Sequence, residues 1–441
     1  MTFSARPLSI FVFLLLIPLA VSKPAFASSS ATVKSNVVRA ENSEAARDTL
    51  ILPYAFSTDD LGFTAGLGGM ITGLHQDQLS IGVTAFGGSE SQGLAAGFWD
   101  YQLPFSDRWY LSGISMLGEY PLMRAYAEPS LTVNSEATRA GSHDSSFDNF
   151  IEAKGSSNWW ELKLEYAFPM GATKDQSYVD YELRGGLLVD PPEPASWNPL
   201  KSGSTVLGLR QYNRYHRYET GEDRLEGAIH ALELGLLHDN TDFAVNPSQG
   251  SSQYFAITHD AAWLESEQQW TFVEFEASKY FSLGATKHAK QRIVALNAWT
   301  GYSPTWNDYA DENGDVQTEN KPPFLEGATL GGFYRMRGYR QNRFHDKAAV
   351  YAAAEYRYTL RYNPLKDIDY LQFLNLDWFQ AVLFVEGGRV AGSYSSDELF
   401  SDWKTDAGVS LRALTAGIVV RMDIANSEEG TNAWVMISHP F

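Results

Sequence analysis

The chain has 441 residues, 44% of them hydrophobic, and carries a formal net charge of −19 from 34 basic and 53 acidic residues. This excess of acid argues against nucleic acid as a partner, because phosphate binding needs clustered lysine and arginine. No run after the N-terminus is apolar enough, over about 20 residues, to form a transmembrane helix. The sequence contains no cysteine, which excludes a lipoprotein anchor, a disulfide framework and a cysteine metal site.

Residues 1–27 have the pattern of a secretory signal peptide. Arg6 supplies the positive charge, residues 10–21 the apolar core, and residues 25–27 (Ala-Phe-Ala) the small-residue cleavage site. The mature chain is therefore expected to leave the cytoplasm. Residues 28–48 follow without hydrophobic periodicity, and we predict a flexible periplasmic tail there.

From Leu61 to Phe441, apolar and polar residues alternate with period two in segments of roughly ten residues, which is typical of membrane-barrel strands. Residues 160–168 show the pattern, with aromatic and aliphatic side chains on one face and three charged side chains on the other. Because charge recurs on one face, strand after strand, that face must contact water. A soluble β-sandwich also alternates, but its strands tend to be shorter and lack aromatics at both ends.

Residues 49–441 are predicted to form one all-β domain, an antiparallel transmembrane β-barrel. Sixteen strands are expected, an even number that places both termini on the periplasmic side. In this count the loop at 126–156 is periplasmic, and an extra or missed strand there would invert its side. The predicted strands are 60–74, 77–88, 91–102, 108–125, 157–168, 177–189, 203–219, 225–240, 251–264, 267–282, 290–304, 347–362, 379–391, 405–412, 415–425 and 431–440.

The longest predicted loop, residues 305–346, begins with an acidic turn. Residues 311–315 (Asp-Glu-Asn-Gly-Asp) superficially resemble a calcium loop. The glycine is misplaced and no acid occupies the closing position, so we predict a solvated turn and no metal site.

The second half of this loop contains Arg337-Gly338-Tyr339, and the next two strands carry Glu355 and Glu386. This arrangement resembles the BamA/TamA type of outer-membrane β-barrel assembly superfamily, also called the bacterial surface antigen family. In that family the loop arginine folds into the lumen and pairs with acids on the two strands after the loop. The resemblance therefore implies a 16-stranded barrel in the bacterial outer membrane, with a long extracellular loop inserted into the lumen.

The pairing also follows from the chemistry of the residues. Alternation points Glu355 and Glu386 inward on neighbouring strands, where both can reach Arg337. A buried guanidinium loses hydration worth several kcal/mol unless carboxylates meet it, and its planar fork can bridge two of them. Gly338 would allow a tight turn, and Tyr339 would pack the loop against the wall. The alternative is an exposed arginine in a solvated loop.

Other segments carry the same resemblance across the mature chain. Residues 53–66 look like the family's entry into its first strand, residues 238–250 like its periplasmic turn, and residues 384–388 and 408–441 like its last strands. The C-terminal residues Ala433, Val435, Ile437 and Phe441 also match the general export signal of outer-membrane barrels.

Two features depart from the family. Members that insert other barrels carry periplasmic POTRA domains, which recruit partners by strand addition, whereas only a short tail is expected before the first strand here. The chain thus resembles a barrel-only branch that lacks POTRA domains. The last strand, 431–441, also lacks the interior glycine that lets the family's terminal strand kink.

The resemblance implies a non-enzymatic role, without a cofactor, in insertion or transfer of proteins or lipids. The implied partners are outer-membrane lipid and lipopolysaccharide, and client or partner outer-membrane proteins stay open as a further class. One alternative is a passive pore for ions or small solutes. Another is a structural or surface-interaction barrel that works through loops 190–202 and 305–326.

Catalytic patterns give no support to an enzyme. The sequence has neither a Gly-x-Ser-x-Gly elbow nor a His-Glu-x-x-His helix. His238 is followed by Asp239, and His259 by Asp260, but adjacent residues on a strand face opposite sides and cannot act together. No catalytic residue is therefore expected.

Overall fold

The computed structural model describes residues 29–40, 48–58, 62–88, 91–127, 139–191, 196–220, 223–266, 268–312, 316–365, 368, 374–415 and 417–441. The predicted signal peptide, residues 1–27, lies outside these described residues. Within them, no helix is long and apolar enough to cross a membrane.

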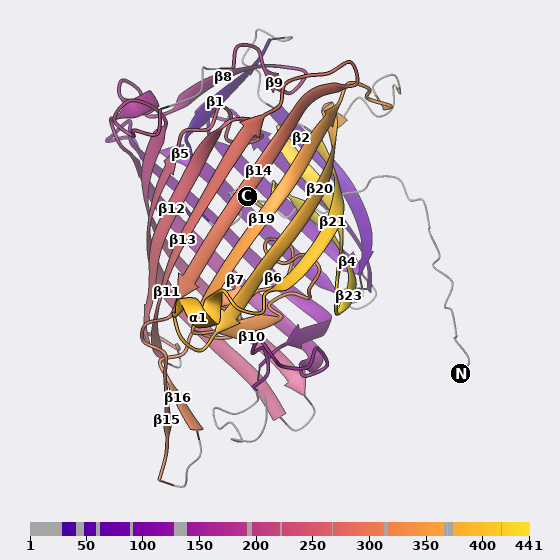
Figure 1. Ribbon diagram of the computed structural model, residues 1–441. Helices are drawn as coiled ribbons and strands as arrows, with labels where there is room; N and C mark the ends of the chain where they lie inside the picture. Colours follow the sequence, from indigo (N-terminus) through magenta and orange to yellow (C-terminus); the bar gives the residue numbers. More distant parts are fainter. Residues whose placement is uncertain are drawn as a thin grey trace, which may run out of the picture.

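Sixteen strands form one antiparallel sheet that curls into a barrel, which confirms the predicted fold and strand number (Figure 1). Sheet neighbours follow one another along the chain, apart from short strands within loops. The barrel strands are β2 (Asp48–Thr58), β3 (Gly62–Thr72), β4 (Ser80–Gly88), β5 (Gln92–Gln102), β6 (Trp109–Ala125), β7 (Ile151–Ala167), β10 (Ser204–Thr220), β11 (Asp223–Asp239), β12 (Gly250–Ala261), β13 (Gln269–Ser282), β14 (Ala289–Tyr302), β19 (Ala348–Leu360), β20 (Leu376–Ala391), β21 (Lys404–Thr415), β22 (Ile418–Ser427) and β23 (Gly430–Ile437).

Strand β11 shows why the sequence forms a barrel wall. Leu232, Leu234 and Leu236 are 41%, 51% and 43% exposed, whereas Glu233 and Gly235 between them are buried. Exposed leucines on one face are stable only if that face contacts lipid, and the charged face then lines the interior.

The strand count agrees with the prediction only because two errors cancel. Residues 48–58 form the complete first strand, β2, which pairs with β3 from Asp48↔Thr72 to Thr58↔Gly62. This segment contains Pro53, which lacks the N–H that an internal strand needs and is tolerated because β2 is an edge strand. The predicted strand at 177–189 is absent from the barrel wall.

Residues 177–189 instead contribute to a three-stranded sheet of β1 (Ser35–Arg39), β8 (Val179–Arg184) and β9 (Leu187–Leu188). Alternating burial in β8 reports a half-buried strand but does not identify the sheet that it joins. This small sheet lies at the top of Figure 1, at the end that the even number of strands assigns to the periplasm. We call this end, with its three-stranded sheet, the periplasmic mouth.

Strand β1 also corrects the prediction of a flexible tail. Residues 29–40 are ordered, and β1 pairs in parallel with β8 over five positions, from Ser35↔Val179 to Arg39↔Leu183. The segment has no apolar periodicity because polar contacts hold it, as described below. Residues 41–47 lie outside the described residues.

The added first strand also reverses the predicted side of the loop between β6 and β7. This loop lies at the extracellular end, where Arg139 Nη2 is 2.9 Å from Asp346 Oδ2 and Arg343 Nη1 donates to Ser145 Oγ over 2.8 Å. Both interactions join it to the long loop before β19. Residues 128–138 of the β6–β7 loop lie outside the described residues.

The long loop before β19 carries four short strands. They are β15 (Asn307–Ala310), β16 (Val316–Glu319), β17 (Ala328–Leu330) and β18 (Phe344–Asp346). Two short helical elements are also described, η1 (Gly171–Thr173) and α1 (Ser396–Leu399). The β15–β16 hairpin projects from the end opposite β1 (Figure 1). Residues 313–315 of the predicted acidic turn lie outside the described part. The remainder of the loop turns into the lumen, where Met336 and Tyr339 join the largest buried apolar cluster.

If the exposed face of β11 contacts lipid, an added charge should destabilise the folded barrel more on that face than in a loop outside the wall. Leu234→Arg, at the middle of β11, should destabilise the folded barrel by about 2–4 kcal/mol, because the guanidinium would enter the bilayer. Urea titration in lipid vesicles measures this change. The control is Leu200→Arg, because Leu200 is 71% exposed outside the barrel wall and should tolerate the change within about 0.5 kcal/mol. Equal effects of the two variants would contradict the assignment.

Candidate site: an arginine network in the barrel lumen

Backbone turns hold the tip of the lumen loop. Gly331 and Gly332 have φ of 106° and 110°, a region that side chains with a Cβ rarely adopt. The Gly332 N–H donates to the Tyr339 carbonyl over 3.1 Å, and the Tyr339 N–H donates to the Met336 carbonyl over 3.0 Å. The tip is therefore a closed turn that presents Arg337.

The structure brings Arg337 together with both acids named from the sequence. Arg337 Nη2 donates to Glu355 Oε1 over 2.9 Å, and Nε donates to Glu386 Oε1 over 3.1 Å. The Arg337 backbone N–H also donates to Glu386 Oε2 over 2.6 Å. All three side chains are 0% exposed. One guanidinium thus joins the loop to β19 and β20.

Two further groups complete the surroundings of this guanidinium. Arg337 Nη1 lies 3.5 Å from Asp423 Oδ2 on β22, and Arg337 Cζ lies 3.5 Å from the centroid of the Phe384 ring. Burial alone would lower the pKa of Arg337, but the Glu386 and Glu355 carboxylates outweigh it and raise the pKa above its ordinary value. The arginine therefore stays charged.

Gly338 allows the tip to approach the last strands. A Cβ at Gly338 would lie 2.5 Å from Asp406 Cβ, closer than real Cβ contacts allow. The Gly338 carbonyl accepts from Ser427 Oγ and from Asn432 Nδ2, each over 2.7 Å. Trp434 Nε1 donates to the Arg337 carbonyl over 2.8 Å. These bonds fasten the tip to β22 and β23.

Tyr339 packs the loop against the barrel wall, as the sequence predicts for this aromatic side chain. It is 0% exposed, its Oη donates to the Thr405 carbonyl over 3.2 Å, and its ring centroid lies 5.2 Å from that of Phe344. The three loop residues therefore contact β19 to β23 together.

Two arginines of the network were missed from the sequence. Arg357 Nε donates to Glu355 Oε2 over 2.8 Å, and Arg412 Nη2 donates to Glu355 Oε1 over 2.6 Å. Both side chains are fully buried. Arg357 stands two residues after Glu355, so strand alternation already placed it on the inward face. No comparable signal showed that Arg412, two strands away, reaches the same carboxylate.

The C-terminal residues of the chain contact the arginine network. Strand β23 stops at Ile437, Ser438 has φ of 68°, and Phe441 is buried. Arg357 Nη2 donates to the Phe441 carbonyl over 3.1 Å. Of the predicted export-signal residues, Ala433 is exposed and Val435 half-buried on β23. The alternation proposed for that signal therefore ends at Ile437, and Phe441 faces the lumen. Its recognition by an assembly machinery stays a prediction.

The first and last strands contribute side chains to one buried apolar cluster. In the part of the chain that the structure describes, no backbone ladder joins β2 to β23, which stand at opposite ends of the sheet order. A buried apolar cluster contains Leu50 and Tyr54 of β2 together with Ile437 of β23. We call this junction the seam.

One group of side chains in the described residues has spacing suitable for a metal ion, namely His143, Asp144 and Asp402 at the extracellular end. Arg389 Nη1 already lies 3.2 Å from His143 Nε2 and 3.7 Å from Asp402 Oδ2. This guanidinium supplies positive charge where a cation would bind, so the group is better described as an ion pair.

The two histidine–aspartate pairs considered as catalytic bases have separate partners. His238 Nδ1 contacts Thr205 Oγ1, whereas Asp239 accepts from Thr241. His259 Nδ1 contacts Thr271 Oγ1. Neither pair therefore forms a base with an orienting acid.

Removing the loop arginine should destabilise the barrel strongly. Arg337→Ala leaves Glu355 and Glu386 buried with one cation fewer, and we expect a loss of about 3–5 kcal/mol in urea unfolding from lipid vesicles. Arg361→Ala is the matched control, because Arg361 is exposed and donates to the Thr286 carbonyl, and it should cost no more than about 1 kcal/mol. A small loss for Arg337→Ala would show that the network contributes little.

Two histidines make the extracellular end sensitive to mild acid. Burial lowers the pKa of both below the ordinary 6.5, assisted by Arg389 for His143 and by Lys321 and Arg139 for His345. The unfolded loops then bind more protons, so stability that is present above the ordinary pKa is lost as the pH falls below it. We expect limited proteolysis of these loops to accelerate between about pH 7 and 5. His345→Phe should weaken that dependence, and a cleavage rate independent of pH would contradict the prediction.

Comparisons with known proteins give one family match and three solved structures that resemble the chain. The Omp85 superfamily domain matches residues 200–432, and a search of curated proteins finds no match. BamA from Haemophilus ducreyi lacking POTRA domains 1–3 is 14% identical, with a TM-score of 0.48 over 89% of this chain and 70% of that chain. CdiB from Escherichia coli is 13% identical, with a TM-score of 0.51 over 89% and 60%. CdiB from Acinetobacter baumannii is 12% identical, with a TM-score of 0.45 over 89% and 58%.

The likeness to Escherichia coli CdiB supports the fold alone, and this chain spans 60% of that protein's length. The family match is stronger evidence, because residues 200–432 are more than half of the 441 residues. They include every barrel strand from β10 to β22 and the complete arginine loop. The chain belongs to the Omp85 superfamily and is an outer-membrane β-barrel.

Proposed function

We propose that this barrel inserts or transfers proteins or lipids at the outer membrane by a non-enzymatic route that uses the seam. The observation that carries the proposal is the junction of β2 and β23, where apolar side chains meet and no ladder is present among the described residues. A strand edge with unpaired N–H and C=O groups is a template for another strand. An opened seam would therefore offer β2 to an incoming chain.

The two sides of the seam differ in stiffness. On the C-terminal side, Ser427 and Asn432 hold the loop tip, and the Arg337 guanidinium joins β19 and β20. On the N-terminal side, β3 reads Gly-Phe-Thr-Ala-Gly-Leu-Gly-Gly-Met-Ile-Thr. Glycines within a strand weaken its pairing and packing. We infer that β2 and β3 move while β19 to β23 stay fixed.

The proposed partners follow from the two surfaces involved. The outward leucines of the wall contact outer-membrane lipid and lipopolysaccharide, and the edge of β2 contacts the client strand. Main-chain pairing requires no particular client sequence. The proposal therefore names extended segments of outer-membrane proteins as a class.

The occupied lumen argues against a passive pore as the resting state. The long loop inserts Met336, Tyr339 and Phe344 into a cluster with Trp270 and Trp299 of the wall. For the alternative of a surface-interaction barrel, the β15–β16 hairpin is still a suitable contact surface, because it projects from the extracellular end. Of the other loop named for this alternative, 190–202, residues 190–191 and 196–202 are described, and the latter lead into β10 at the periplasmic end, away from the cell surface.

A crosslink across the seam tests the proposal. In the cysteine-free chain, Leu50→Cys with Ile437→Cys would join β2 to β23, and oxidation should block the activity. The assay measures how fast a urea-unfolded eight-stranded outer-membrane barrel inserts into phosphatidylcholine–phosphatidylethanolamine vesicles that contain the protein. Reduction should restore the rate.

The matched control places the same crosslink inside a regular ladder. Leu234 and Ile257 are register partners on β11 and β12, so the pair Leu234→Cys and Ile257→Cys should leave the insertion rate unchanged. If the oxidised seam variant accelerated insertion as well as the reduced one, the seam would have no role. A steady open conductance of the unmodified protein in planar bilayers would instead favour the pore.

A further inference from the structure

We propose that the periplasmic mouth is a receptor site for an extended, lysine-bearing peptide segment, and that residues 29–40 occupy it as a tethered plug. This site is separate from the arginine network and from the seam. The plug closes the periplasmic end of the barrel, and its release does not require the wall strands to separate.

Lys34 is the side chain that the proposed receptor site recognises. Its Nζ lies 2.9 Å from Asp100 Oδ1 on β5 and 2.7 Å from Glu165 Oε2 on β7, and the lysine side chain is 0% exposed. Moving an ammonium out of water costs several kcal/mol unless carboxylates meet it. Two strands of the wall supply those carboxylates, so the pocket fits a lysine head group.

The residues before Lys34 are also held individually. The Thr32 N–H donates to Glu165 Oε1 over 2.8 Å, and Ser30 Oγ lies 2.8 Å from Tyr254 Oη. Ala31 is fully buried, and a Cβ at Gly208 would lie 3.3 Å from the Ala31 Cβ. The lack of a side chain at Gly208 therefore leaves room for the Ala31 methyl group. The site therefore selects small and hydroxyl residues ahead of the lysine.

The residues after Lys34 cross the mouth. β1 pairs in parallel with β8 over five positions, an interaction between main chains that works for many sequences. At its end, Arg39 Nη1 lies 3.3 Å from Asp377 Oδ1 on β20. Ser30 contacts β12, so the segment is fixed to widely separated strands of the wall. It lies across the end opposite the β15–β16 hairpin (Figure 1).

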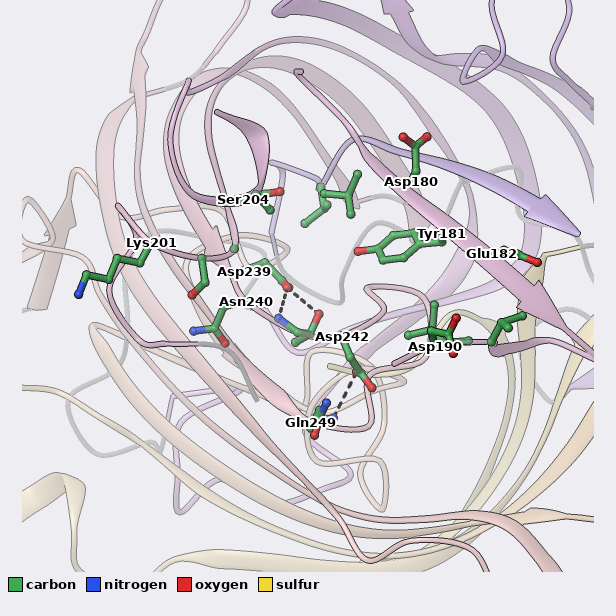
Figure 2. Close-up of a pocket in the computed structure, with 18 residues that line it drawn as sticks. Asp180, Tyr181, Glu182, Asp190, Lys201, Ser204, Asp239, Asn240, Asp242 and Gln249 are labelled. Carbon is green, nitrogen blue, oxygen red and sulfur yellow. Dashed lines mark hydrogen bonds between the residues drawn. The ribbon is translucent and has the colours of Figure 1, made fainter. Parts of the chain in front are cut away.

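Charge at the mouth favours this occupant. Residues 29–40 contain Lys34 and Arg39 and no acidic residue, in a chain whose net charge is −19. Val33 also lines a cavity of about 520 Å³ between β8 and the β11–β12 turn. Figure 2 shows five carboxylates and one lysine among its labelled residues, namely Asp180, Glu182, Asp190, Asp239, Asp242 and Lys201. The negative charge of the periplasmic mouth therefore favours binding of the basic segment 29–40.

Thiol labelling tests the plug directly, because the chain has no cysteine of its own. Ser30→Cys, at a position 6% exposed, should react slowly with a bulky maleimide in the folded, detergent-solubilised protein. Adding Lys34→Met should raise the labelling rate at least about tenfold, because the segment leaves its site more often. Val37→Cys, at a position 41% exposed, should label readily in both backgrounds.

Lys201→Met is the matched lysine control, because Lys201 is exposed at the same end, and it should leave Cys labelling at position 30 slow. Lys34→Arg keeps the charge and should also preserve protection. If Lys34→Met folds and protects position 30 as well as the parent does, the proposal is overturned. This readout involves no client protein, so its failure is distinct from failure of the proposed insertion activity.

A peptide experiment tests the receptor even if Lys34→Met alone folds poorly. The variant Lys34→Met, Asp100→Asn, Glu165→Gln removes the unpaired buried charges together with the lysine. A fluorescent peptide of residues 29–40 should bind the single variant Lys34→Met and should bind the triple variant at least about tenfold more weakly. Where Lys34→Met alone does not fold, the labelling test is made in the full-length triple variant, in which Cys at position 30 should also label at least about tenfold faster. Unchanged protection of position 30 in the folded triple variant would overturn the proposal. Equal binding with and without the two carboxylates would overturn the proposal.

Discussion

The structure depends on a charged guanidinium that has no access to water. Arg337 is enclosed by Glu355, Glu386 and Asp423, and in a buried site each of these charges is stable only while the others are present. If the loop left the lumen, Glu386 would lose its ion pair with Arg337, and Glu355 would keep only Arg357 and Arg412. This mutual requirement fixes the extracellular loop, β19, β20 and β22 as one unit.

The same physical solution recurs at the other end of the barrel. Lys34 is as deeply buried as Arg337 and is also held by two carboxylates from different strands. In each case a loop or an N-terminal segment enters a charged interior and is held there by buried ion pairs as well as by apolar packing. A barrel whose inner wall is rich in acids can thus close both ends with basic segments.

In the proposed function, these two anchors hold the ends of the barrel while the seam moves. The arginine network reaches β23 through the loop tip, where Asn432 and Trp434 donate hydrogen bonds to backbone carbonyls of the loop. Strand β3, beside β2, is rich in glycine. Rigidity on one side and compliance on the other would let the barrel admit a strand while it keeps its overall shape.

The sequence by itself determined the class of fold and the central ion pairs. Period-two alternation requires one wet and one lipid-facing surface, and it placed Glu355 and Glu386 inward because the side-chain period of a strand is fixed. Local pattern could not assign partners, however. Residues 177–189 alternate like a wall strand but join β1, and residues 48–58 contain a proline yet form the first strand, because sheet membership depends on distant chain segments. Arg412, Phe441 and Lys34 likewise became part of buried networks only when the curled sheet brought remote strands and both ends of the described chain into one lumen.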